Sequence, residues 1–338
     1  MSAHNAIYDV LSDILGVGEA EARRLAEKRR VFRLMRYRDI TYLVVRREAM
    51  GLREGTSILI RGGDYRVVPG YPSIRRILLL DIAVPRHFPG KVVVEEKMDG
   101  YNVRVVRAWG EIYAVTRGGY ICPYTTARLR RMYGGALEAL GDDETVIAGE
   151  VVGMENPYTR YRYPEAPGFD YFVFDVYRGG RVVPPLESKR LAEEHGLRHV
   201  PVLGVIGRGD VEELRRMLET LEQRGREGVV LKDAEGRVPP LKYTTSYINK
   251  NDLELGMRFF FEEGRSFLFS RVLRQVFKAY EEGWRGDRLY EEECLLGRVI
   301  IEPAVKAIRS VEEGTGLYEE YTLRFASHEE IREFEDYM

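Results

Sequence analysis

The chain has little cysteine and few side-chain amides among its 338 residues. Its two cysteines, Cys122 and Cys294, are too few and too far apart for a disulfide framework or a thiolate metal site. We therefore expect reduced thiols in a cytosolic protein. Only five asparagines and two glutamines occur, whereas arginine and glutamate are abundant, a balance typical of proteins from hot environments.

Long apolar runs and an excess of one charge are also absent. No run reaches the roughly 18 residues that a membrane span needs, and the N-terminus, MSAHNAIYDV, has no signal-peptide pattern. We therefore expect a cytoplasmic protein with no membrane partner. The net charge of -2 excludes a histone-like polycation, so a nucleic-acid partner would need a local basic surface.

The remaining composition, 44% hydrophobic and 31% charged, predicts a globular α+β protein. Residues up to about 50 are expected to be helical, because 18–35 hold strong helix formers without a breaker. Pro85, Pro89 and Gly90 predict a boundary or a loop before the next strand. Short β-branched or aromatic runs predict antiparallel strands at 91–97, 101–108, 111–117, 145–152, 171–177 and 228–232. Helices are expected at 127–140, 210–223 and after about 251, with 329–338 as a solvated acidic helix.

The sharpest local pattern is Lys97-Met98-Asp99-Gly100, where one predicted strand ends and the next begins. The tetrad is short, and most lysines are surface charges. Further polar and aromatic side chains follow in one order through the same β-rich region: Glu95, Glu96, Asn102, Arg117, Glu150, Phe172, Phe174, Glu227, Lys232 and Lys242. Each alone has an ordinary explanation, since Phe172 and Phe174 share a strand face and could be core. The ordered set is hard to explain in that way.

This set resembles the covalent nucleotidyltransferase superfamily of ATP-dependent ligases and mRNA capping enzymes, over roughly residues 91–247. Asn102 lies five residues after Lys97, where a large group of RNA ligases has asparagine and DNA ligases usually have arginine. VEEKMDGYNVRVV, TRGGYICPYTT and GEVVGMENPY look like the archaeal ATP-dependent RNA ligases. One departure is Lys242-Tyr243-Thr244, where many relatives have Lys-x-Lys; Lys250 is a candidate substitute.

The resemblance implies a central nucleotidyltransferase domain of antiparallel β-sheets with flanking helices. A small N-terminal α/β module would precede it, and an all-helical region through which the family dimerises would follow. The implied bounds are 1–65 for the module, 66–250 for the adenylyltransferase domain, 251–320 for the dimerisation domain and 321–338 for a C-terminal helical segment.

The resemblance also implies three reaction steps. Lys97 takes AMP from ATP, the AMP passes to a 5′-phosphate on RNA, and a 3′-hydroxyl then expels it, with circular RNA as an expected product. A lysine amine must be neutral to attack phosphorus. Lys232 and Lys242 would disfavour its charged form and neutralise the phosphates.

Residue type and resemblance together suggest the remaining roles. Phe172, or otherwise Phe174, stacks on adenine, while Glu150 accepts hydrogen bonds from the ribose. Arg117 and Asn102 engage phosphate or ribose. Glu227 suits Mg²⁺, for which Mn²⁺ could substitute, and either Glu95 or Glu96 lies near the adenine amine. The alternatives are a DNA ligase, a capping guanylyltransferase, and a non-catalytic RNA-binding protein that keeps the ligase fold.

Overall fold

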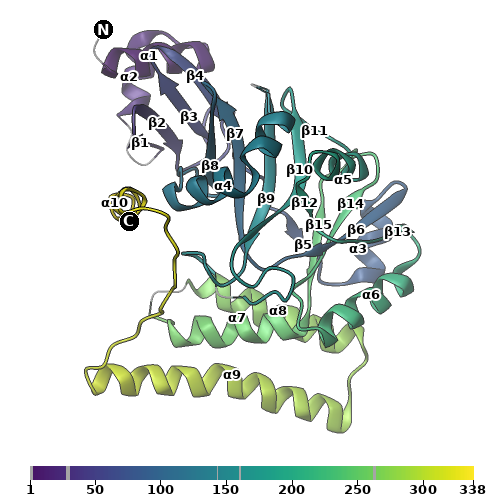
Figure 1. Cartoon of the computed structure of the whole chain (residues 1–338). Helices are drawn as coiled ribbons and strands as arrows, with labels where there is room; N and C mark the ends of the chain where they lie inside the picture. The colour runs from purple at the N-terminus through teal and green to yellow at the C-terminus, as the bar shows by residue number, and fades with distance from the viewer. Residues whose placement is uncertain (1–2, 28–30, 143, 160, 262–263) are drawn as a thin grey trace. The chain divides into compact units, whose positions relative to one another are not determined.

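A computed structural model of the chain describes residues 3–27, 31–142, 144–159, 161–261 and 264–338 (Figure 1). Contacts divide the chain into two compact units. Unit 1 comprises Met1–Ser73, Gly100–His199 and Thr322–Met338, and unit 2 comprises Ile74–Asp99 and Val200–Tyr321. One crossing between the units therefore falls inside the Lys97–Gly100 tetrad.

The first part of unit 1 is a four-stranded antiparallel sheet covered by two helices. Its elements are α1 (Ala3–Leu15), α2 (Glu19–Ala26), β1 (Phe32–Tyr37), β2 (Ile40–Val45), β3 (Ser57–Arg61) and β4 (Asp64–Val68). The prediction of a helix over 18–35, and of helix up to about residue 50, was wrong. Helix α2 ends at Ala26, because β1 pairs with the β-branched and aromatic β2 along its whole length. This tertiary pairing outweighs the helix propensity of residues 32–37.

The second sheet of unit 1 has the order β11-β10-β9-β7-β8, with β12 beside β10. Its strands are β7 (Tyr101–Ala108), β8 (Glu111–Thr116), β9 (Thr145–Val152), β10 (Asp170–Arg178), β11 (Arg181–Val182) and β12 (Arg198–His199). Helices α4 (Pro123–Leu140), α5 (Pro185–Glu194) and α10 (His328–Glu335) belong to this unit. Phe334 of α10 is only 8% exposed and packs in the sheet's core, so the interpretation of 329–338 as merely solvated was wrong.

Unit 2 contains a five-stranded sheet of order β13-β6-β14-β15-β5 and five helices among its described residues. The strands are β5 (Arg75–Arg76), β6 (Lys91–Lys97), β13 (Val202–Gly207), β14 (Gly228–Asp233) and β15 (Leu241–Thr244). The helices are α3 (Leu80–His87), α6 (Val211–Gln223), α7 (Ser246–Arg258), α8 (Arg265–Glu281) and α9 (Gly286–Glu312). The predicted loop before β6 is present at residues 88–90 and includes Pro89 and Gly90, whereas Pro85 lies inside α3, so that part of the prediction was wrong.

The α+β prediction is confirmed, and the strands and helices predicted after residue 90 are present. Antiparallel pairing dominates all three sheets, with parallel contacts at β10–β12 and β15–β5. The implied bounds 1–65, 66–250, 251–320 and 321–338 stay predictions. Among the described residues, no helix combines the length and apolarity needed to cross a membrane.

Candidate active site

One face of the unit 2 sheet carries the lysines singled out in the sequence. Glu95 and Lys97 are two residues apart along β6, so both project from the same face. Directly paired residues of neighbouring strands also share a face. Lys232 is opposite Val93, while Val230 is opposite both Glu95 and Lys242. The pairing therefore places Glu95, Lys97, Lys232 and Lys242 on one face.

The opposite face of this sheet is its hydrophobic core. Val92, Val94, Val229 and Leu231 are fully buried there and pack in a cluster that also holds residues of α3 and α6. Burying such side chains stabilises a fold by about 1.5–3 kcal/mol each. The apolar face therefore holds the strands, and the polar face can present charged groups.

The structure separates the two adjacent glutamates, Glu95 and Glu96. Glu95 lies on the face of Lys97, and its carboxylate is 2.7 Å from the ammonium of Lys232. The side chains of this pair are 1% and 7% exposed. Glu96 points to the other face, where it lies 3.4 Å from Arg226. Of the two alternatives left open by the sequence, Glu95 therefore shares a face with the candidate nucleophile.

Lys97 forms an ion pair with Glu227, with 2.6 Å between Nζ and Oε2. Glu227 directly precedes Gly228, which is opposite Lys97 in the β6–β14 ladder. Gly228 has φ +146°, and a Cβ there would lie 2.1 Å from the carbonyl oxygen of Tyr243. Only glycine therefore allows β14 to approach β15 at this point, and this approach positions Glu227 beside the lysine.

Asp99, to which sequence reasoning gave no role, has a perturbed carboxyl. Burial, reinforced by the negative charge of Glu227, raises its pKa to about 7, against the smaller opposing effect of Lys97. Its place inside the tetrad was the available signal. Asp99 therefore changes charge near neutral pH.

Lys242 of β15 projects from the sheet face that carries Lys97. Its neighbour Tyr243 points into the core side, so Thr244 is the next side chain on the site face. Lys250, the candidate substitute for a second lysine, lies on α7 with its Nζ 3.1 Å from Glu292 of α9. In this structure Lys250 is thus part of a contact between helices.

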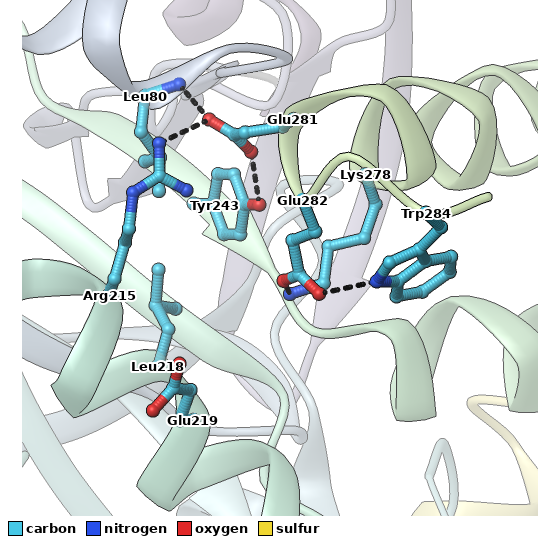
Figure 2. A pocket seen from close by; sticks show the side chains of 9 residues that line it. All are labelled: Leu80, Arg215, Leu218, Glu219, Tyr243, Lys278, Glu281, Glu282 and Trp284. Atoms are coloured by element: carbon cyan, nitrogen blue, oxygen red, sulfur yellow. Dashed lines mark hydrogen bonds and ion pairs between the residues drawn. The ribbon is translucent and has the colours of Figure 1, made fainter. Parts of the chain in front are cut away.

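Tyr243 contacts Glu281 of α8, as Figure 2 shows. Its hydroxyl donates to Glu281 at 2.7 Å, and the Arg274 guanidinium lies 3.8 Å from its ring centroid. Glu281 also accepts from the backbone N–H of Leu80 at 2.6 Å, next to a cavity of about 370 Å³. Helix α8 therefore anchors the strand that carries Lys242, and sequence reasoning missed this anchor.

In unit 1, a second row of predicted residues crosses three strands. Asn102 of β7 and Phe172 of β10 are both directly opposite Glu150 of β9, so the three share one face. The amide oxygen of Asn102 is buried with no hydrogen-bond partner among the described residues. Because an amide oxygen only accepts, a hydroxyl or amino group of a ligand would satisfy it.

The two phenylalanines of β10 differ in their surroundings. Phe172 is opposite Glu150, and the Arg198 guanidinium lies 4.3 Å from its ring centroid. A register shift between Val173 and Asp175 leaves Phe174 outside the ladder, where its ring meets Tyr71 with 5.2 Å between centroids. This bulge, invisible in the sequence, interrupts the alternation that suggested equivalent positions. Sequence reasoning also missed Arg198.

Arg117 follows β8 directly and is exposed, with its guanidinium 3.1 Å from the hydroxyl of Ser73. The backbone around it is held by Arg104, which is 1% exposed. Arg104 donates to the carbonyl oxygens of Gly55 (3.0 Å) and Thr116. Burial lowers its pKa to about 10, so it stays charged at neutral pH. Sequence reasoning missed Arg104, whose position inside a strand gave no signal.

The described residues contain no group of three or more His, Cys, Asp or Glu side chains arranged to hold a metal ion. Glu227, beside Lys97, is thus not part of such a cluster. Mg²⁺ is often bound by one or two carboxylates together with substrate phosphates and water. The donor set therefore fits an ion that arrives with a phosphorylated substrate better than a permanent metal centre.

Two sequence profiles match the chain. One described as RNA ligase matches residues 90–244, and one described as Ligase Pab1020 C-terminal region matches residues 255–338. An uncharacterized protein of Methanocaldococcus jannaschii is 38% identical over 321 residues, which cover 93% of this chain and 80% of that protein.

Two solved structures are similar over almost the whole chain. An archaeal ATP-dependent RNA ligase (form 1) has a TM-score of 0.89 at 34% identity, with 98% of this chain and 88% of that chain covered. A provisionally named ATP-dependent DNA ligase from Aquifex aeolicus has a TM-score of 0.84 at 31% identity, with 94% and 87% covered. The two matched proteins are thus named for different polynucleotides.

Proposed function

This chain belongs to the archaeal ATP-dependent RNA ligase family of the covalent nucleotidyltransferases and is a ligase, and on that premise we propose that it joins RNA ends through a lysyl–AMP on Lys97. The observation that carries the proposal is one sheet face with Lys97 at its edge and Lys232 and Lys242 on neighbouring strands. The substrates are ATP and RNA with 5′-phosphate and 3′-hydroxyl ends.

In the first step, Nζ of Lys97 attacks the α-phosphorus of ATP. A P–N bond forms, the bond to the β-phosphate oxygen breaks, and pyrophosphate leaves. The amine must lose its proton beforehand, whereas the Glu227 carboxylate at 2.6 Å favours the protonated form. The Lys97–Glu227 pair is therefore a resting arrangement, which the lysine leaves in order to react. The positive charges of Lys232 and Lys242 disfavour the protonated form of Lys97, and they also neutralise phosphate oxygens.

In the second step, a 5′-phosphate oxygen of RNA attacks the lysyl–AMP phosphorus. The P–N bond breaks, which frees Lys97 and leaves a 5′–5′ pyrophosphate-linked RNA end. In the third step, a 3′-hydroxyl attacks the RNA 5′-phosphorus, and AMP leaves as a phosphodiester forms. The protein mainly aligns the groups and stabilises charge in such transfers. Family likeness favours joining within one strand, which yields circular RNA.

The predicted nucleotide contacts follow from donor and acceptor chemistry. Phe172 stacks on adenine with the face of its ring that Arg198 leaves open, and Glu150 accepts from the ribose hydroxyls. The amide oxygen of Asn102 accepts from a ribose hydroxyl, while Arg117 binds phosphate. Glu95, because it shares the face of Lys97, is preferred over Glu96 for the adenine amine.

Mg²⁺, or Mn²⁺ in its place, is the proposed cofactor, with Glu227 as its protein ligand. When bound, such an ion supplies positive charge that offsets charge on the phosphates of ATP. Binding of the ion by Glu227 would also compete with its ion pair to Lys97.

The intact mass of the purified protein after incubation with ATP and Mg²⁺ tests the covalent step. We expect one added adenylate in the wild type and none in Lys97→Ala, because the tetrad offers no other amine. An adduct retained in Lys97→Ala would show that another residue is the nucleophile. No adduct in wild-type protein first stripped with pyrophosphate would favour the non-catalytic RNA-binding alternative.

The DNA ligase alternative has support in the Aquifex aeolicus match. Asn102 argues against it, since DNA ligases usually have arginine at that position. Matched 5′-phosphorylated RNA and DNA strands, offered to pre-adenylated protein, separate the two. We expect sealed product from RNA; sealing of DNA alone would contradict the proposal.

We also propose that the chain forms a homodimer through its C-terminal helices. An apolar stripe of α9, Ile301, Val305 and Ile308, is 39–63% exposed at helical spacing. Exposed apolar stripes of this kind are typical of protein interfaces. Light scattering should report a dimer for the wild type and a monomer for the double variant Ile301→Glu and Ile308→Glu. A matched change at the exposed Leu186 of α5 should leave the dimer intact; a monomeric wild type would refute the proposal.

The cytoplasmic location and the hot-environment source stay predictions from the composition.

A further inference from the structure

A basic segment lies in the first part of unit 1, whose role the sequence left open. Residues 23–47 contain ten arginines and lysines but only two acidic residues, in a chain of net charge -2. Seven of the ten basic side chains are described, and all seven are exposed. This is the kind of local basic surface that a nucleic-acid partner requires.

Three of these seven arginines already have carboxylate partners. Arg23 pairs with Glu27, Arg24 with Glu21, and Arg38 with Glu333. The other four make no ion pair with any carboxylate in the part of the chain that the structure describes: Arg33, Arg36, Arg46 and Arg47. An exposed guanidinium without an acidic partner can donate several hydrogen bonds to a phosphate.

Two of these four arginines line a groove of about 670 Å³ beside the edge strand β1. Apolar side chains of Phe32, Leu34 and Leu43 contribute to its wall, and the ring of Tyr8 comes from α1. Arg33 and Arg46 also line the groove, and Arg33 does so from its edge, because it alternates with Phe32 and Leu34 along β1. Glu27 also lines the groove, but its charge is offset by Arg23 at 3.4 Å. Apolar and aromatic surface for bases, combined with cations for phosphates, is typical of sites for single-stranded nucleic acid.

The groove is connected to the predicted nucleotide contacts through residues of the same unit. The guanidinium of Arg33 lies 5.7 Å from the ring centroid of Tyr120. Tyr120 is on the loop that follows β8, three residues after Arg117. Arg33 therefore contacts the loop that also carries Arg117, the predicted phosphate contact.

We propose that this groove binds single-stranded RNA several nucleotides away from the end being joined. Arg33 and Arg46 contact the phosphate backbone, and the apolar wall with Tyr8 accommodates a base. The inference rests on the proposed function, since the ligand is the RNA substrate of the ligase. It gives the N-terminal module a role in RNA affinity and none in attachment of AMP.

The test uses the full-length protein and a fluorescein-labelled, 5′-phosphorylated single-stranded RNA. Its dissociation constant is measured by anisotropy over a range of salt concentrations for the wild type and for Arg33→Ala with Arg46→Ala. Each lost phosphate contact on a single strand lowers the salt slope by about 0.7, so we expect a decrease of about 1.4. The KM for RNA in sealing should rise several-fold, and formation of lysyl–AMP without RNA should stay unchanged.

A matched control removes two exposed, ion-paired arginines of unit 1 that do not line the groove, through Arg24→Ala and Arg190→Ala. This variant loses the same charge and should keep the wild-type slope. Lysine at positions 33 and 46 should restore most of the affinity, because a phosphate contact depends on charge.

The outcomes separate the inference from the proposed function. A wild-type salt slope and KM in the Arg33→Ala, Arg46→Ala variant would overturn the proposal that the groove binds RNA. An equal decrease of the salt slope in the control variant would overturn it as well. Absence of lysyl–AMP in the wild type would instead overturn the proposed function.

Discussion

The buried ion pair of Lys232 and Glu95 should make a large contribution to the free energy of unfolding, although it lies on the candidate catalytic face. Its side chains are only 7% and 1% exposed, with 2.7 Å between Nζ and Oε2. Lys232→Met would leave the carboxylate buried without its partner ion, and Glu95→Gln would do the same to the ammonium. Breaking a buried pair by removing one partner typically costs about 3–5 kcal/mol. Each single variant should therefore lose about that much free energy of unfolding.

The double variant Lys232→Met with Glu95→Gln should lose far less than the sum of the two single losses, because it leaves no orphaned charge. Urea unfolding at pH 7, followed by circular dichroism, of the wild type, the two single variants and the double variant gives the double-mutant cycle. Distant, independent sites add within about 0.5 kcal/mol. Additive losses would therefore refute the coupling. The folded double variant should still fail to form lysyl–AMP, because both side chains face the nucleophile.

Two further predictions concern the surroundings of this face. Tyr243→Phe removes the hydrogen bond to the carboxylate of Glu281, which should cost about 1.5–3 kcal/mol of unfolding free energy and reduce sealing. Trp284→Phe removes a similar bond to an exposed carboxylate (Figure 2) and should cost less than half as much; equal losses in calorimetry would contradict the anchor. The raised pKa of Asp99, about 7, means that its neutral form favours the fold, so stability should fall as pH rises from about 4 to about 7. Asp99→Asn should flatten this dependence in thermal unfolding at several pH values, and an unchanged slope would rule out Asp99 as its source.

Much of the candidate site was predictable because its residues stand at strand ends. The β-branched run within residues 91–97 predicts a strand, and β6 has these bounds. The helix prediction over 18–35 failed because tertiary pairing outweighed local propensity. Residues 33–36 of β1 are good helix formers, and they form a strand because β2 pairs with them.

The family, the α+β class and the ordered set of candidate residues were predictable from the amino-acid sequence, since these depend on local pattern and motif order. Only the tertiary structure separated Glu95 from Glu96 and Phe172 from Phe174, because a strand's register and a bulge decide which face a side chain occupies. Only the tertiary structure brought Glu281 to Tyr243 and Glu227 to Lys97. These contacts join residues 38 and 130 positions apart in sequence, and no local pattern encodes such a distance.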